Sequence, residues 1–493
     1  AASGLTGGNW NTVIGKNAAS SMTLIGGQNV FLGMEAGCTQ TTTCWSVVIG
    51  QGARLPITDG YKQLSIGCYG CSWIVGDCNF NVGIGTTNPN TPVGSGVTAK
   101  LAVGILTAYQ LYGDGSNLSG VGFSPDADEN LVAGTDAGAN LDGTNACDNI
   151  LLGCFAGTNI TSGNSNQLIG LKAGCCITTG HTNIAIGSLA LGGYLGCSAC
   201  EMTGDYNIAM GYESGDYMTD ANYNVALGAY ALMGNNCQNR NVGNYNVAFG
   251  KWAGAGVYSG GVNIFIGKYA GRELYSGDDN IFLGTNAAKC RRSGNYNIAI
   301  GSEALRGGTA DSYDNTGAYN IAFGIWAGQE VTSGCHNTLF GFSAGKLITT
   351  GTSNIFIGCE AGEGTTTTGC NVAIGHEAGK GNTGEHNLLL GTNAGSATTA
   401  GNYNVALGYL SQRCFSTGCC NISIGYEALK GSTTSSDNIG GCNIAIGNQA
   451  GYNVCCGDEN VSIGSSAGKC LSHGNDNIFM GNGAGLCASW GSD

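Results

Sequence analysis

The stretch Asn246-Val-Ala-Phe-Gly250-Lys-Trp-Ala-Gly254 returns 17 residues later as Asn263-Ile-Phe-Ile-Gly267-Lys-Tyr-Ala-Gly271. The shared pattern is Asn, an aliphatic residue, a small or apolar residue, an aliphatic residue, Gly, two variable residues, Ala, and then Gly or Leu. We call the first residue the lead asparagine and count positions from it, so that Gly250 occupies position +4. Most steps between repeats are 17 residues, and the lead asparagines of the regular copies are Asn130, Asn149, Asn166, Asn183, Asn207, Asn224, Asn246, Asn263, Asn280, Asn297, Asn320, Asn337, Asn354, Asn371, Asn387, Asn404, Asn421, Asn443, Asn460 and Asn477. Looser copies begin at Asn11, Asn29, Ser46, Gln63 and Asn81, which makes about 25 repeats in all.

The length of the repeat predicts the fold class. Repeats built from helix pairs need more than about 30 residues, whereas 17 residues suit one turn of a β-solenoid. The run at positions +1 to +3 alternates, so the two aliphatic residues face one side of a strand and the middle residue faces the other. Few middle residues are polar, so we expect both faces to be buried, one inside the coil and the other against neighbouring chains. We therefore predict an all-β, parallel β-solenoid (β-roll) of about 25 coils with a 17-residue repeat.

Stacked coils would place the lead asparagines above one another at the spacing of neighbouring strands, about 4.8 Å. Side-chain amides in such a column can hydrogen-bond along the stack, as they do in cross-β structures. We interpret the column as structural, and the predicted ladder includes Asn149, Asn166, Asn183, Asn207, Asn224, Asn246, Asn263, Asn280, Asn297, Asn320, Asn337, Asn354 and Asn371.

Interruptions of the repeat divide the chain. Residues 86–129 lack the pattern, so we predict a first solenoid block at 1–85, a junction or linker module at 86–129 and a main block at 130–493. Four longer steps begin at Asn183, Asn224, Asn297 and Asn421, and these repeats carry leucine at position +8, at Leu191, Leu232, Leu305 and Leu429. Glycine at +8 can make an immediate tight turn through a positive φ. With leucine there, we expect the chain to continue, turn later and leave a surface loop, all four loops lying on one side of the solenoid.

Composition and charge exclude several classes of protein. Glycine supplies 89 residues without a Gly-X-Y period, which excludes collagen, and 42% hydrophobic with 10% charged residues argues against disorder. A net charge of −14 argues against a nucleic-acid partner. No window approaches the roughly 18 apolar residues of a membrane span, so we expect none.

The 24 cysteines suggest an oxidising, extracellular setting. Many lie at the predicted corners of the coils, where the next coil is within the Cα separation that a disulfide requires. The alternative is thiols packed as small apolar groups. The Cys-x-x-Cys pairs Cys68/Cys71 and Cys197/Cys200 lack the further ligands of a zinc site, so we expect no metal and no cofactor. The candidate disulfide residues are Cys175, Cys176, Cys370, Cys419, Cys420, Cys442, Cys455 and Cys456.

No catalytic residues are expected, and we interpret the chain as not being an enzyme. Its five histidines lie outside protease or triad motifs. Its carboxylates are scattered, whereas glycoside cleavage needs a pair, so a depolymerase ranks last among the alternatives. Exposed aromatic residues are favoured in recognition, and a candidate binding strip at position +6 includes Tyr230, Trp252, Tyr269 and Trp326. The alternative is a solvated corner. Tyrosines directly before the lead asparagine are expected to stack on one another.

The pattern in Asn371-Val-Ala-Ile-Gly375-His-Glu-Ala resembles the head repeats of trimeric autotransporter adhesins. That resemblance implies a left-handed β-roll and a homotrimer. The longer period, and the phrases Asn81-Val-Gly-Ile-Gly-Thr-Thr-Asn-Pro89 and Gly104-Ile-Leu-Thr-Ala-Tyr-Gln-Leu-Tyr-Gly-Asp-Gly-Ser-Asn-Leu-Ser-Gly120, look more like phage tail fibres, cyanophage ones especially.

This second resemblance implies a structural tail fibre that takes part in host attachment. Its place would be the virion or the extracellular space, and its partners would be copies of itself and a host cell-surface glycan or protein. The alternative that remains open is an extracellular bacterial filament or adhesin subunit, polymerised end to end and cross-linked by disulfides.

Overall fold

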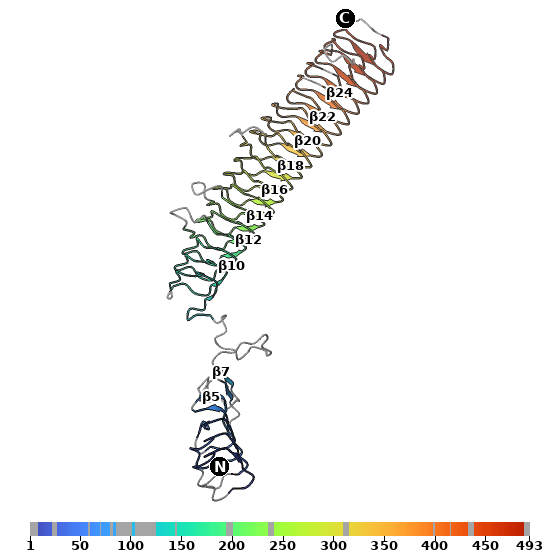
Figure 1. Ribbon diagram of the computed structural model, residues 1–493. Coiled ribbons are helices and arrows are strands. Elements are labelled where there is room, and N and C mark those ends of the chain that lie inside the picture. The colour runs from blue at the N-terminus through green and yellow to red at the C-terminus, as the bar shows by residue number, and fades with distance from the viewer. Residues whose placement is uncertain are drawn as a thin grey trace. The chain divides into compact units, whose positions relative to one another are not determined.

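The computed structural model describes residues 8–21, 27–57, 60–69, 71–78, 82–84, 101–103, 125–142, 145–193, 201–234, 241–308, 315–397, 400–414, 416–431 and 438–487. The chain divides into two compact units, Ala1–Asn117 and Leu118–Asp493. Every regular element in the described ranges is a β-strand (Figure 1). Most of the predicted junction, at 86–100 and 104–124, lies outside those ranges, as do most residues of the four predicted surface loops.

The first unit begins as a parallel stack and then departs from it. Strands β1 (Thr12–Ile14), β2 (Val30–Leu32), β3 (Val47–Ile49) and β4 (Leu64–Cys68) pair in parallel, one per repeat. Strand β5 (Cys71–Gly76) then turns back antiparallel to β4, and β6 (Val82–Ile84) is antiparallel to β5. Strand β7 (Leu101–Val103) pairs in parallel with β6. The repeat did not predict this hairpin, because β4 carries the same alternating pattern as the strands that pair in parallel.

The second unit is the predicted solenoid. Its strands pair in parallel in chain order and in register, so that position +1 of each coil meets +1 of the next, as Val247 meets Ile264. With the first unit the chain makes about 23 turns, and a stack of strands spaced at about 4.8 Å makes the second unit about 90 Å long. This confirms the all-β solenoid with its 17-residue repeat. The strands are β8 (Leu131–Ala133), β9 (Ile150–Leu152), β10 (Gln167–Ile169), β11 (Ile184–Ile186), β12 (Ile208–Met210), β13 (Val225–Leu227), β14 (Val247–Phe249), β15 (Ile264–Ile266), β16 (Ile281–Leu283), β17 (Ile298–Ile300), β18 (Ile321–Phe323), β19 (Thr338–Phe340), β20 (Ile355–Ile357), β21 (Val372–Ile374), β22 (Leu388–Leu390), β23 (Val405–Leu407), β24 (Ile422–Ile424), β25 (Ile444–Ile446), β26 (Val461–Ile463) and β27 (Ile478–Met480).

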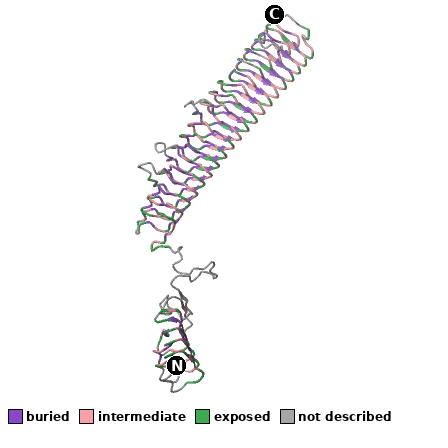
Figure 2. Ribbon diagram, in the orientation of Figure 1, coloured by how far each residue is buried: buried purple, intermediate pink, exposed green. Residues whose placement is uncertain are grey.

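Only one face of each strand points into the core of its coil. The middle strand residues, such as Ala248 and Phe265, are fully buried, and they pack with the alanine at +7 and the apolar residue at +11, such as Val257. The flanking aliphatic residues point outward, and Phe249 is 55% exposed. Buried residues therefore run along the inside of the stack (Figure 2). A single chain buries only one of the two faces that the sequence predicted to be covered.

Glycine at +4 sets how closely the coils stack. At Gly324 φ is +139°, and a Cβ there would lie 2.3 Å from the carbonyl oxygen of Gly341 in the next coil. Real Cβ atoms do not approach backbone that closely, because the overlap is repulsive. The strand can therefore turn at the spacing of hydrogen-bonded coils only if this residue has no side chain.

The expectation for leucine at +8 is wrong. Leu429 has φ of +44° and Leu191 has φ of +48°, so leucine makes the same left-handed turn as glycine does. The leucine side chains are buried inside the coil and lie against the glycine at +8 of the following coil, as Leu429 Cδ2 lies against Gly451. Burial of a large apolar side chain stabilises by about 1.5–3 kcal/mol, which offsets a left-handed backbone cost of about 1–2 kcal/mol.

Candidate functional site

The lead asparagines form a column of hydrogen bonds inside the second unit. The backbone N–H and Nδ2 of Asn166 donate to Oδ1 of Asn149 at 2.9 and 3.1 Å, and Nδ2 also donates to the carbonyl of Gly180 at 2.9 Å. The bond from backbone N–H to Oδ1 recurs at every step from Asn130 to Asn477. A buried polar group is tolerated when its hydrogen bonds are made, so this column holds coils together and offers no surface to a ligand.

A second column, at position −2, runs in the opposite direction and was not predicted. The backbone N–H of His181 donates to Asp205 Oδ1, and the backbone N–H of Asp205 donates to Asn222 Oδ1, both at 2.7 Å. In this column the backbone N–H of one coil donates to a side chain of the coil that follows, whereas the lead asparagine donates to the coil before. The signal was present in the sequence as the recurrence of Asn, Asp or His two residues before the lead position, including Asn164, His181, Asp205, Asn222, Asn244, Asp278, Asn295, Asn402, Asp458 and Asn475.

The tyrosines before the lead asparagine stack, as predicted. The rings of Tyr206 and Tyr223 lie 4.9 Å apart, and those of Tyr223 and Tyr245 lie 5.0 Å apart, nearly parallel in both cases. Tyr319 stacks in the same way between Tyr296 and His336. Each of these tyrosines is about half exposed. The exposed aromatic column therefore lies at position −1.

The proposed strip at +6 is made of half-buried aromatic residues that contact neighbouring coils. Tyr230 and Trp252 stack at 4.2 Å between ring centroids. The Arg272 guanidinium lies 5.2 Å from the Trp252 ring, and Lys346 Nζ lies 4.8 Å from the Trp326 ring. Tyr269 is flanked in the same manner by Lys268, Arg272 and Lys289. Arg272, Lys289 and Lys346 all occupy position +9 of the following coil, a pairing with +6 that the sequence contains and that the strip hypothesis overlooked.

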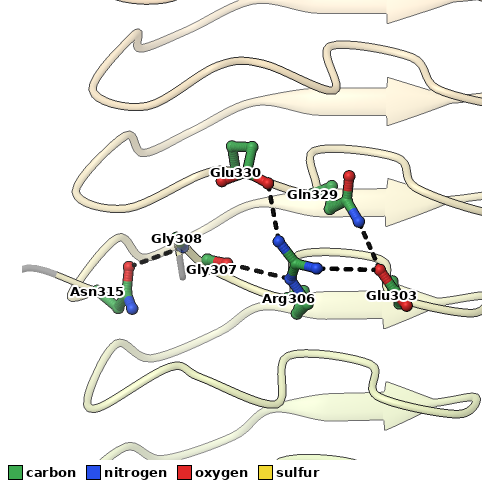
Figure 3. Close-up of polar contacts among 7 residues, drawn as sticks. All are labelled: Glu303, Arg306, Gly307, Gly308, Asn315, Gln329 and Glu330. Atoms are coloured by element: carbon green, nitrogen blue, oxygen red, sulfur yellow. Dashed lines mark hydrogen bonds and ion pairs between the residues drawn. The ribbon is translucent and has the colours of Figure 1, made fainter. Parts of the chain in front are cut away.

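At two places where +6 is acidic, the same corner forms ion pairs between coils, and Figure 3 shows one of them. The Arg306 guanidinium lies 3.2 Å from Glu303 in its own coil and 2.8 Å from Glu330 in the next, while Gln329 Nε2 donates to Glu303. Lys380 lies within 3.2 Å of Glu360, Glu363 and Glu377. Its hydrogen bonds, first to Glu360 and then to Glu377, raise the pKa of Lys380 and keep the amine charged. The residues at +6 and +9 thus contact one another from coil to coil along the stack.

The outward face of the sheet in the second unit is apolar and partly exposed. Large apolar side chains point outward from +1 and +3 in coil after coil, some coils add an apolar or aromatic residue at +5, and Phe323 stacks on Phe340 at 4.9 Å. Monomeric proteins rarely expose an apolar patch beyond about 300–600 Å². We call this set the outward apolar face, and its exposed members include Ile169, Leu171, Met210, Tyr212, Val247, Phe249, Ile264, Ile266, Ile321, Phe323, Ile325, Phe340, Phe342, Ile355, Ile374, Tyr409, Ile422, Ile424, Tyr426, Ile446, Ile478 and Met480.

A shallow polar groove crosses the coils of β15 to β18. Hydroxyl, carboxylate and carboxamide groups line it, from Ser259, Ser276, Asp278, Ser293 and Asn295. Hydroxyl and carboxamide groups can donate hydrogen bonds to a polar ligand and accept them from it, and a carboxylate can accept them.

The candidate disulfide residues fall in different places. Cys175 is buried, and its thiol donates to the carbonyl of Gly192 at 2.9 Å. Cys370, Cys420 and Cys442 are exposed thiols at position −1, the column of the stacked tyrosines. Burial and then the neighbouring Cys420 raise the pKa of Cys442. The Cys419 sulfur accepts from the backbone N–H of Asn402 as a member of the −2 column.

Cys176 is buried beside Cys175. The hydrogen bond between the two side chains lowers the pKa of Cys175. No metal-binding group was expected from the residue spacings. The structure nevertheless brings the ligand atoms of Cys455, Cys456 and His473 within 4.8 Å of one another. The two cysteines and the histidine belong to consecutive coils, and that spacing matches no familiar motif.

No protein-family model matches this chain, and comparison with curated proteins gives no match either. Among the residues that the structure describes, no helix has the length and apolar character needed to cross a bilayer.

Proposed function

We propose that this chain is a structural fibre protein whose solenoids associate sideways through the outward apolar face. One observation carries the proposal: +1 and +3 are aliphatic or aromatic in nearly every coil, although the structure leaves them partly exposed in one chain. Burying apolar surface is worth about 25 cal/mol per Å², and the repeat extends that gain along the whole solenoid. A homotrimer, in which three such faces enclose a shared core, is the form that the sequence resemblance favours.

The particular role that we propose is a phage tail fibre involved in host attachment, located on the virion. Its support is the resemblance of residues 81–89 and 104–120 to such fibres, together with the solenoid itself. The exposed tyrosine column and the groove lined by Ser259, Asp278 and Asn295 are the surfaces we propose for a host glycan or protein. Aromatic rings and hydrogen-bonding groups together suit such recognition.

Sedimentation of the full chain tests the lateral assembly. We expect the wild type to sediment as a trimer. Phe249→Lys and Ile266→Lys place charges in the outward apolar face, so both should shift the chain toward the monomer. Ser259→Lys adds the same charge at an exposed position away from the strands and should leave the trimer intact. A monomeric wild type, or a trimer that tolerates both face variants, would contradict lateral assembly.

Immunogold electron microscopy on the source material tests the particular role. Label at the tails of virions would support the tail fibre. Label along continuous filaments, with virions unmarked, would support the alternative, an extracellular bacterial filament or adhesin subunit polymerised end to end. That alternative draws on the 24 cysteines, because exposed thiols such as Cys370 and Cys487 can cross-link subunits.

A further inference from the structure

Two consecutive coils bring three soft donor groups together beyond strands β25 and β26. Cys455 and Cys456 occupy positions +12 and +13 of one coil, and His473 occupies +13 of the next. Their ligand atoms all lie within 4.8 Å of one another. Cys455 is 7% exposed, Cys456 is half-buried, and His473 is exposed. The group therefore spans from the coil interior to the surface, where an ion can enter.

The surrounding hydrogen bonds suit a metal-binding state. The Cys455 thiol donates to the carbonyl of Ser472 at 3.1 Å, and this carbonyl also accepts the backbone N–H groups of Cys455 and Cys456 at 3.3 and 3.1 Å. When the Cys455 thiol loses its proton, the Ser472 carbonyl therefore still accepts two backbone hydrogen bonds. Ser472 Oγ lies 2.8 Å from His473 Nδ1. A ligating imidazole is typically held in this way through its second nitrogen.

Thiolate and imidazole donors select particular metals. Soft sulfur ligands favour Zn²⁺ and Cu⁺ over Mg²⁺ or Ca²⁺. Bonds of about 2.3 Å to sulfur and about 2.0–2.1 Å to nitrogen place ligand atoms of one ion roughly 3.3–3.8 Å apart. Side-chain shifts of about 1 Å would therefore close the group around an ion.

We propose that Cys455, Cys456 and His473 form a binding site for a thiophilic metal ion, Zn²⁺ or Cu⁺, that clamps two consecutive coils. Binding displaces the two thiol protons to solvent and leaves two thiolates and one neutral imidazole as ligands. Zinc would complete its tetrahedron with water, whereas Cu⁺ is satisfied by the three protein ligands. This site is independent of the proposed assembly and of the role in attachment.

The test measures metal stoichiometry on the full chain, purified metal-free and under reductant. One arm offers Zn²⁺ buffered by a competing chelator, and the other offers Cu⁺ buffered by glutathione, so that isolated thiols do not compete. We expect the wild type to retain one equivalent more than His473→Gln and Cys456→Ser in one of the two arms, and that arm identifies the ion. His473→Cys, which supplies another soft ligand, should retain the equivalent.

Two control variants guard against general effects of substitution. His181→Gln changes a histidine of the −2 column, and Cys154→Ser changes a half-buried cysteine of another coil. Both should bind as much metal as the wild type, and circular dichroism should show every variant folded. The proposal is overturned if His473→Gln retains as much metal as the wild type in both arms. A wild type that retains no metal in either arm overturns it as well.

Discussion

At the scale of single residues, every turn of the coil uses backbone conformations that L-amino acids seldom adopt. Each coil turns through left-handed residues at −1, +6 and +8 and through glycine at +4, and many of the first three are not glycine, such as Tyr223, Trp252 and Leu429. Each such residue costs about 1–2 kcal/mol. The hydrogen bonds and stacked contacts with the neighbouring coils offset this cost, so the conformation persists only while the coils are stacked.

The first prediction separates close packing from backbone strain. Gly324→Ala should destabilise the second unit by about 2–4 kcal/mol, because the new Cβ meets the Gly341 carbonyl in addition to the φ penalty. Gly481→Ala is the control: it also occupies position +4 and its φ is +120°, but a Cβ there would meet nothing within 4 Å. The control should lose about 1–2 kcal/mol. Thermal unfolding followed by circular dichroism measures both, and equal losses would refute the packing argument.

The second prediction concerns pH. Burial raises the pKa of Asp216 to about 7, whereas in the unfolded chain it is near 3.9. Between about pH 4 and pH 7 the folded state keeps a proton that the unfolded state has lost, so stability falls as pH rises through this window, by about 4 kcal/mol at most. Asp216→Asn keeps the shape and removes the titration. Denaturation curves should show the wild type losing stability relative to Asp216→Asn as the pH rises from 4 to 8. A difference in stability that does not change with pH would contradict a raised pKa for Asp216.

At the scale of the coil, contacts between equivalent positions decide which side chains are compatible. A leucine at +8 occupies space that the next coil provides by having glycine at +8, and all four leucines obey this rule, being followed by Gly215, Gly254, Gly328 and Gly451. The longer steps thus occur together with a leucine that fills the space beside the next coil's glycine, and the turn at +8 is not delayed.

A double-mutant cycle tests this exchange. Gly451→Ala should be destabilising because its Cβ would lie 2.9 Å from Leu429 Cδ2. Leu429→Ala alone should cost about 2–5 kcal/mol as a cavity. In the double variant the new Cβ no longer meets the leucine side chain, so the clash is relieved. The double variant should therefore lose less stability than the two single variants lose together, and the difference, the coupling energy, should be about 0.5–3 kcal/mol. Additive losses, measured by thermal unfolding, would show that the two residues do not share space.

The cysteines of the −1 column provide a prediction for oxidising conditions. Cys420 and Cys442 occupy the same position of adjacent coils, and they contact each other. We expect air oxidation to join them, because neighbouring coils lie within the reach of a disulfide. Mass spectrometry of unreduced peptides should then show a Cys420–Cys442 cross-link, and thermal stability should rise. Cys370, whose column neighbours are Ser353 and His386, should stay unlinked within the chain, and a linked Cys370 with separate Cys420 and Cys442 would contradict the assignment.

At the scale of the whole molecule, the solenoid behaves as a one-dimensional stack in which each coil contacts its neighbours. The lead asparagine column runs through it from Asn130 to Asn477, so the inner coils both give and receive side-chain hydrogen bonds. The −2 column adds bonds in the opposite direction where that position carries an accepting side chain. Such a stack should tolerate the loss of one complete repeat unit, but not the loss of part of one.

Deletion of residues 263–279 tests this modularity. It removes one 17-residue repeat and places Ala248 against Phe282 in place of Phe265, and Trp252 near Lys289 in place of Arg272. The shortened chain should fold with thermal stability close to that of the wild type. Deletion of 263–270 removes about half a coil and breaks the register, so it should unfold the neighbouring coils. Hydrogen exchange of the backbone amides in the neighbouring coils measures the effect of each deletion. Similar amide protection in the two deletion variants would contradict a stack of discrete units.

The sequence by itself determined the repeat, the strand and the column of lead asparagines. A 17-residue period with alternating apolar residues leaves few folds available, and a buried asparagine in every repeat must find its hydrogen bonds in the next one. The stacking of Tyr206, Tyr223 and Tyr245 followed from the same logic. These predictions are local, because they depend on residues that are one period apart.

Only the tertiary structure decided which strand face turns inward, that Leu429 turns as glycine does, and that β4 and β5 form a hairpin. It also assigned Trp252 and Trp326 to contacts with Arg272 and Lys346, and it brought His473 to Cys455 and Cys456. The physical reason is common to all of these: each depends on the distance between side chains on adjacent coils. The pattern within a repeat fixes the coil, but the packing between coils fixes what each position can touch.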